Sequence, residues 1–195
     1  MGRLSRVCYA VIAAAFGVSA PALAQDQQAP SIQEVAVVPR FADGVLQGCA
    51  VNFQVIQYDT MYAGGRPVLL DGSFQIYNFG SGRVSALLKL GFIDETGGAH
   101  TAPSSAYLVN GLVTSADEAL HQMGSETPGF GLFGFRMGEQ VTNSIVRIMD
   151  TGKFSFAYQR EGGSGGVPIE IDMSQSPEKV SSWSECIDAL LLNDR

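Results

Sequence analysis

The chain has 195 residues, of which 46% are hydrophobic and 16% charged, with 12 Lys and Arg against 19 Asp and Glu. The formal net charge of −7, carried by dispersed acidic residues, argues against nucleic acid or an anionic membrane surface as a partner, because both require a basic patch. The length fits a single domain with a sizeable core.

Residues 1–24 are predicted to be a secretory signal peptide. Arg3 and Arg6 precede a short apolar run, and a small-x-small site ends at Ala24. The run is too short to span a bilayer, and no later segment approaches 18 apolar residues, so we expect no transmembrane segment in the mature chain. Cleavage removes two of the 12 basic residues, which leaves 10 against 19 acidic ones and a net charge of about −9. The predicted location is the periplasm of a Gram-negative bacterium, or the medium.

Two cysteines, Cys49 and Cys186, remain after cleavage, because Cys8 leaves with the signal peptide. A cysteine pair in an oxidising compartment is usually bridged, so we predict a disulfide between them. The closed loop exceeds 100 residues, for which the chain-entropy relation gives nominally about 4 to 5 kcal/mol. A redox pair would need a C-x-x-C spacing, which is absent.

The pattern along the chain predicts a flexible leader over 25–43, interrupted by Pro30 and Pro39, with an edge contact near 35–38. The compact domain is predicted to begin at Gly44 and to extend to residue 195. Alternation of apolar and polar residues predicts strands there. The first of them cover residues 45–58, 68–78, 84–93 and 106–113, with a bulge or tight bend at 71–72.

The second half of the domain is predicted to contain a short capped helix over 115–120 and a hairpin of strands 141–149 and 154–160. In the second hairpin strand Phe154, Phe156 and Tyr158 share one face. A last strand follows over 167–172.

The chain ends in the clearest helix signal. Ser176 is a capping residue, Pro177 suits the first helical position, and Trp183 and Cys186 share an apolar face. We therefore predict a mainly β (α+β) fold, an antiparallel sheet or sandwich-like domain with a C-terminal amphipathic helix packed on it. In layout it is similar to small exported proteins of Gram-negative bacteria, including the invasion-associated locus B type; the similarity implies no site residue.

The sequence contains no recognisable catalytic motif, and no catalytic residue, metal or cofactor is predicted. His100 and His121 are the only histidines. A mixed site of these with Asp117 or Glu118 is conceivable, but a solvated helix end is the preferred interpretation. The glycine-rich stretch 162–166 is predicted to be a loop and not a phosphate cradle, because no Lys-Ser or Lys-Thr ends it.

A segment of alternating glycine and apolar residues is the most unusual feature. It offers a candidate partner-contact loop if it is exposed. The residues concerned are Phe130, Leu132, Phe133 and Phe135. If the segment is buried, it is a strand whose glycines allow close approach of another element, and this is the preferred interpretation.

These observations favour a non-enzymatic exported protein that binds an envelope protein or another envelope component. It would do so through its sheet face or through the loop around 124–138. Two alternatives from other classes stay open. One is an envelope hydrolase with a carboxylate-based site. The other is a carrier of a small apolar ligand in a β pocket.

Overall fold

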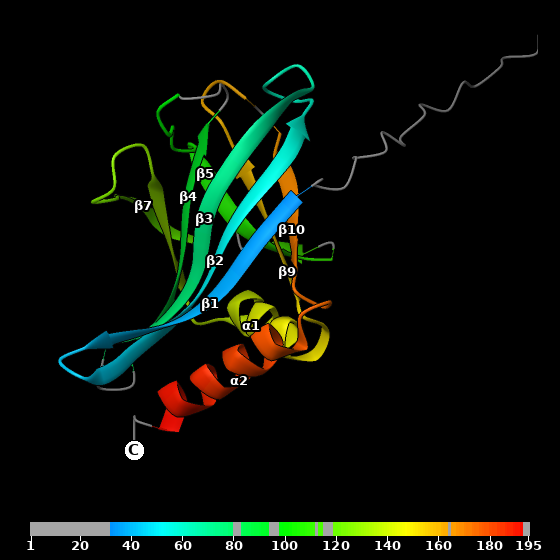
Figure 1. The fold of residues 1–195 in the computed structure, drawn as a ribbon. Coiled ribbons are helices and arrows are strands. Elements are labelled where there is room, and N and C mark those ends of the chain that lie inside the picture. Colours follow the sequence, from blue (N-terminus) through cyan, green and yellow to red (C-terminus); the bar gives the residue numbers. More distant parts are fainter. Residues whose placement is uncertain are drawn as a thin grey trace, which may run out of the picture.

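The computed structural model describes residues 32–79, 83–93, 98–111, 113–114, 119–163 and 165–192. The predicted signal peptide lies outside these residues. Within them the chain forms ten strands and two helices, and the strands make two antiparallel sheets (Figure 1). This architecture, with a helix at the C-terminal end of the described chain, confirms the predicted mainly β fold class.

The larger sheet has six strands in the order β1-β2-β3-β4-β8-β7, all antiparallel. The strands are β1 (Ile32–Ala42), β2 (Val45–Asp59), β3 (Arg66–Asn78), β4 (Val84–Ile93), β8 (Gly131–Arg136) and β7 (Ala119–Gly124). The three strands predicted over 45–58, 68–78 and 84–93 are thereby confirmed. The register of β3 runs through Asp71 and Gly72 without a shift, so the predicted bulge is absent.

Strand β1 corrects the predicted flexible leader. Residues 32–42 pair with β2 along their length, from Ile32 opposite Ile56 to Ala42 opposite Val45. Pro39 is compatible with this strand because β1 is an edge, where a missing N–H leaves no central ladder bond unmade. The edge contact predicted near 35–38 is therefore confirmed and extends over residues 32–42, whereas residues 25–31 lie outside the described part of the chain.

The side chain of Gln33 joins β1 to the second sheet. Its Nε2 donates to the carbonyl oxygen of Glu170 at 2.9 Å, and its Oε1 accepts from the backbone N–H of Asp172 at 3.0 Å. The two bonds resemble a short stretch of ladder. Part of the expected leader is thus a connection between the sheets.

The second sheet has the order β10-β9-β5-β6. Its strands are β10 (Val167–Asp172), β9 (Lys153–Gln159), β5 (Ser105–Asn110) and the two-residue β6 (Val113–Thr114). Phe154, Phe156 and Tyr158 are completely buried on one face of β9, as the alternation predicted.

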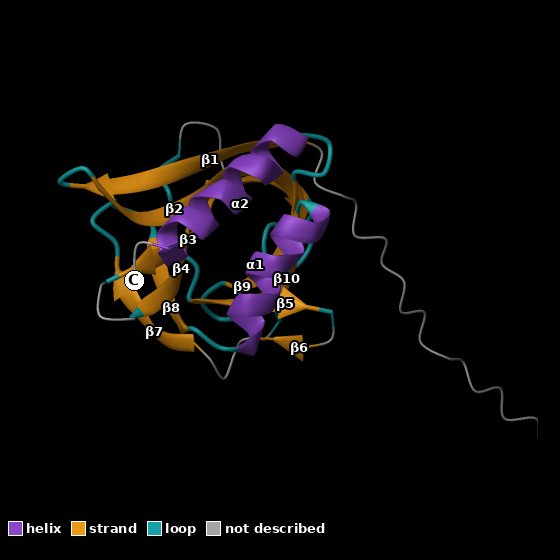
Figure 2. Ribbon diagram, turned by 90° about the horizontal axis from the view of Figure 1, so that it is seen from below, coloured by secondary structure: helices purple, strands orange, loops and turns teal. Residues whose placement is uncertain are grey.

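Two helices lie at one end of the two sheets, as the view from below shows (Figure 2). Helix α2 (Pro177–Leu192) packs against β2, and helix α1 (Glu139–Thr151) packs against β9 and β5. The buried residues of α2 include Trp183 and Cys186, which confirms the predicted C-terminal helix and its apolar face.

Helix α1 corrects the strand predicted over 141–149, and the predicted hairpin with β9 is therefore wrong. Val141, Ser144 and Ile148 are buried at spacings of three and four, while Thr142 and Asn143 are exposed. That spacing is helical. The Val and Ile content favoured a strand, but β propensity depends strongly on tertiary context.

Strand β7 overlaps the end of the short helix predicted over 115–120. Residues 115–118 lie outside the described part of the chain, whereas Ala119–Gly124 is extended and pairs with β8. His121 therefore belongs to a strand and not to a helix end.

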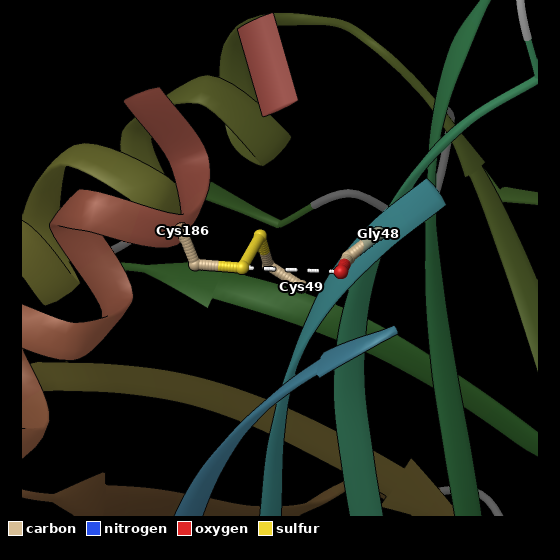
Figure 3. The surroundings of a disulfide bond; sticks show 3 residues. All are labelled: Gly48, Cys49 and Cys186. Atoms are coloured by element: carbon tan, nitrogen blue, oxygen red, sulfur yellow. Dashed lines mark hydrogen bonds between the residues drawn. A yellow bond between two sulfur atoms is a disulfide. The ribbon is translucent and has the colours of Figure 1, made fainter. Parts of the chain in front are cut away.

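The predicted disulfide is present between Cys49 of β2 and Cys186 of α2, with 6.0 Å between their Cα atoms (Figure 3). Both cysteines are buried, and Sγ of Cys186 lies 3.8 Å from the carbonyl oxygen of Gly48. The bond fastens the last helix to the second strand of the larger sheet, across 137 positions of sequence.

Aromatic rings occupy the space between the sheets. The rings of Phe53 and Phe156 are 5.3 Å apart, those of Phe74 and Phe154 are 5.3 Å apart, and Trp183 lies 6.2 Å from Phe74. Such offset pairs stabilise a core beyond the burial of their area. An apolar ligand between the sheets would have to displace these rings, which weighs against the carrier alternative.

Candidate functional site

A groove of about 640 Å³ crosses the outer face of the larger sheet, on the side away from the aromatic core. Strands β1 to β4 form its floor, and two connecting segments, one after β4 and one between β7 and β8, contribute to its wall. The residues that line it are Glu34, Ala36, Arg40, Asn52, Phe53, Gln54, Asp71, Gly72, Ser73, Gln75, Lys89, His100, Thr127 and Phe130. Most of these side chains are polar or charged.

The floor consists of polar side chains placed in rows by strand register. Asn52 lies opposite Ser73, which in turn lies opposite Lys89. Paired residues project to the same face, so the three form one row across the sheet. In the neighbouring row Gln54 lies opposite Asp71, and its Nε2 donates to Asp71 Oδ2 at 3.4 Å. These two rows of β2 and β3 therefore give adjacent hydrogen-bonding groups on the outer face.

Two floor residues are buried although they are polar. Ser73 is 5% exposed and Gln75 is 8% exposed, and the Gln75 Nε2 donates to the Ser73 hydroxyl. Buried amides and hydroxyls are costly unless they are paired, so this pair is held in a defined geometry.

Gly72 permits the close packing beneath the floor. A Cβ at this position would lie 2.5 Å from the carbonyl oxygen of Lys89 and 2.8 Å from Cζ of Phe53. Any larger residue would force the strand or the core ring to shift. The Asp-Gly pair that suggested a bulge or bend thus lies in an unbroken register of a closely packed floor.

Two cationic side chains flank the floor. Arg40 of β1 reaches across to Asn52 of β2, with Nη2 3.4 Å from Oδ1. Its Nε is buried and has no hydrogen-bond partner among the described residues. On the other side the ammonium of Lys89 donates to the Thr127 hydroxyl at 2.6 Å and lies 4.8 Å from the ring centre of Phe130.

Acidic groups lie in the row of Gln54. Glu34 lines the groove from β1, and Asp71 lines it from β3. The Nε2 of His100 lies 3.6 Å from Oδ2 of Asp71, in a pair whose side chains are about one-third exposed (27% and 30%). The groove therefore presents both signs of charge around a neutral polar floor.

The wall depends on a glycine. Gly129 has φ of +78°, and a Cβ there would lie 2.0 Å from the carbonyl oxygen of His100. Only glycine fits this approach, which brings the Phe130 ring to 4.5 Å from the His100 ring. Two segments far apart in the sequence thus meet at one side of the groove.

The predicted contact loop is divided between the two faces of β8. Phe133 and Phe135 are buried in the core, opposite Leu88 and Ala86 of β4, so they are not accessible to a partner. Burial of these two is what the strand interpretation predicted. Phe130 lines the groove, and Leu132 is half-buried on the outer face beside Lys89. The contact residues that remain accessible are therefore those next to the groove.

A second polar cluster is enclosed between the sheets. Tyr158 donates to Asp59 Oδ2 at 3.1 Å and accepts from Gln57 Nε2 at 2.8 Å. Asp59 Oδ1 accepts the backbone N–H groups of Met61 and Tyr62. Burial, followed by the Asp59 charge, raises the pKa of Tyr158 above its ordinary value. The Asp59 side chain is fully enclosed, with Nη1 of Arg160 3.9 Å from its Oδ2, and the cluster connects the two sheets.

A metal site is not formed by the described residues, because no three His, Cys, Asp or Glu side chains come together there. Asp117 and Glu118 lie outside the described part of the chain. The described helices also include none that is long and apolar enough to cross a membrane. The groove, by contrast, brings polar and charged side chains of four strands together.

Comparison of the chain with protein-family models, curated proteins and solved structures finds no match. The alternation over 45–58 predicted a strand, which contains Asn52 and Gln54, but it did not predict the groove. The available signal was the alternation of amide, hydroxyl and carboxylate side chains at outer positions of two adjacent strands, in place of the usual Lys and Glu.

Proposed function

We propose that the protein is an exported, non-enzymatic binding module that holds a polar component of the bacterial envelope in the groove on the outer face of β1 to β4. One observation carries this proposal. The groove has the size of a small-molecule site, about 640 Å³, and its floor is a row of paired amide and hydroxyl groups. A surface selected only for solubility would not need such residues partly buried.

The export part of the proposal is supported by the disulfide and by the signal-like first 24 residues. A disulfide-tied β domain is a rigid scaffold. Sites on rigid strands keep their geometry without ligand, which lowers the entropy cost of binding. A preformed groove on four adjacent strands fits this role.

A binding role fits the groove better than the hydrolase alternative. Of its carboxylates, Asp71 contacts both Gln54 and His100, and Glu34 is exposed to solvent. A carboxylate that acts as general acid usually lies in an apolar environment that raises its pKa. The polar floor offers amide groups that could hydrogen-bond a ligand.

The test is co-sedimentation of the purified, oxidised protein with two insoluble envelope fractions, cell-wall sacculi and membrane vesicles. The groove variant is Ala36→Trp, which fills the groove from an exposed position of β1. The control is Ala42→Trp, the same change at an exposed position of the same strand that does not line the groove.

Wild type and Ala42→Trp are expected to sediment with one of the fractions, and Ala36→Trp to stay in solution. Equal sedimentation of all three would place the binding surface elsewhere. No sedimentation of the wild type with either fraction would contradict the proposed function itself.

A further inference from the structure

We propose that the ligand of the groove is a carboxylated sugar, and that the Arg40 guanidinium receives its carboxylate. This inference rests on the proposed function and names the chemistry that the same groove recognises. It starts from an unmet hydrogen-bonding requirement and from the types of side chain around it.

The unmet requirement is at Arg40. Its Nε is buried without an acceptor among the described residues, and the contact of Nη2 with Asn52 Oδ1 is long, at 3.4 Å. A buried donor left unpaired is unfavourable, more so when it is charged. Arg40 lines the groove, so a turn of its side chain that opens Nε toward the groove would let a ligand acceptor remove that penalty.

The geometry of arginine selects the acceptor. Nε–H and one Nη–H of a guanidinium point in parallel and match the two oxygens of a carboxylate. Phosphate shares this match but carries up to a second negative charge. Glu34 and Asp71 line the same groove, and the chain is acidic as a whole. A single negative charge on a neutral polar body is therefore the better complement.

The floor selects the body of the ligand. Asn52 and Gln54 present amide groups, and the buried Ser73–Gln75 pair lies beside them; amides suit the donors and acceptors of sugar hydroxyls. A peptide would need apolar pockets for anchoring side chains. The large apolar residues of the lining are Phe53, which is 2% exposed, and Phe130, whose ring lies against His100 and Lys89. The groove therefore favours a glycan over a peptide.

Lys89 has a secondary role. It lies on β4, two strand spacings from β2, which is roughly 10 Å. A carboxylate bound at Arg40 over Asn52 cannot also contact Lys89, which already donates to Thr127. Lys89 instead meets the next sugar unit, so its replacement should weaken binding less than replacement of Arg40.

The test measures affinity by calorimetry and location by amide and Arg Nε–H NMR shifts of the oxidised protein. The probes are short oligosaccharides of galacturonate, glucuronate and mannuronate, each with its methyl ester. The ester keeps the sugar but loses the charge. The variants are Arg40→Gln, Lys89→Gln and the control Arg136→Gln, which makes the same charge change at an exposed outer position of β8.

At least one acid oligosaccharide is expected to shift the Arg40 Nε–H signal and to bind roughly tenfold or more tightly than its ester. Arg40→Gln should lose that difference, Lys89→Gln should lose less, and Arg136→Gln should bind like the wild type. Equal affinity for acid and ester, or unchanged binding by Arg40→Gln, would overturn the inference.

The two proposals fail in different ways. If no uronate oligosaccharide binds but envelope sedimentation still depends on Ala36, the carboxylated-sugar inference is wrong and the binding module stands. The same holds if a peptide with a free C-terminal carboxylate binds and its amide does not. If sedimentation also fails, the proposed function is wrong as well.

Discussion

The two faces of the larger sheet are built by the same strands and differ in every respect that matters for function. Along β2, Val51, Phe53 and Val55 point inward and are almost completely buried, while Asn52 and Gln54 point outward into the groove. The inner face is packed with aromatic rings. The outer face is polar and hollowed. Stability is therefore expected to reside in one face and recognition in the other, and each can be perturbed separately.

The largest effect is expected in the aromatic core. Phe154→Ala removes a completely buried ring that contacts Phe53, Phe74 and Phe156. Such truncations lower the free energy of unfolding by about 3 to 5 kcal/mol. Urea unfolding followed by Trp183 fluorescence measures the loss. Phe79→Ala, at a ring 56% exposed, is the control and should cost less than about 1 kcal/mol. Similar losses in both variants would contradict the assignment of stability to the inner face.

The disulfide gives the next largest effect. Replacing both Cys49 and Cys186 with Ala is expected to lower the free energy of unfolding by about 2 to 4 kcal/mol, because the denatured chain is no longer constrained over 137 positions. Thermal unfolding of the wild type with and without reductant should reproduce most of the shift. Binding at the groove should be retained in the folded fraction, since the bond lies at the α2 end of the inner face. Loss of groove binding in a variant that is still folded would show that the faces are coupled.

The inner face was largely predictable from the sequence, and the reason is periodicity. Strands such as β4 and β10 were predicted with correct bounds, because apolar residues recur at every second position of the buried face. The buried face of α2 was predicted from the helical spacing of its apolar residues. The Cys49–Cys186 disulfide was predicted from export to an oxidising compartment. These signals are local or compositional, so they need no knowledge of which strands become neighbours.

The wrong predictions have one physical origin, because tertiary contacts determined the secondary structure of those segments. Helix α1 contains Val and Ile residues that favour a strand, and it is helical because Val141, Ser144 and Ile148 pack on one side. The sequence of β1 alone suggests a flexible leader, and its extended structure depends on pairing with β2. The groove is lined by side chains of four strands and two connecting segments. A local sequence pattern cannot indicate that these segments lie close together.

A smaller effect is expected at the enclosed polar cluster, which belongs to the inner face. Tyr158→Phe leaves Asp59 Oδ2 and Gln57 Nε2 without the tyrosine hydroxyl, at a cost of about 1 to 3 kcal/mol. Burial and Asp59 raise the pKa of Tyr158, so the folded state keeps this proton at a pH where the unfolded chain, with a pKa near 10, loses it. Stability from this group is therefore complete below pH 10 and falls as the pH rises further.

Chemical unfolding from pH 9 to 11 tests whether the stability contributed by Tyr158 falls as the pH rises. The difference in unfolding free energy between wild type and Tyr158→Phe should narrow with rising pH, by at most about 1.4 kcal/mol per pH unit. Tyr58→Phe, which removes a hydroxyl from a half-exposed ring of β2, is the control for substitution at the surface. A difference that stays constant over this range would contradict enclosure of the Tyr158 hydroxyl.

The smallest effect on stability is expected at the groove, and it sharpens the comparison of the two faces most. Gln54→Ala removes an exposed amide whose contact with Asp71 is long, at 3.4 Å, so the free energy of unfolding should change by no more than about 0.5 kcal/mol. Binding of the envelope fraction should nevertheless weaken, because a ligand hydroxyl would lose a direct partner. Parallel denaturation and binding measurements on this variant separate the two quantities. A face that serves recognition should tolerate truncation of a side chain in the absence of its ligand. A loss of stability as large as that of Tyr158→Phe would therefore show that the row of Gln54 and Asp71 has a structural role.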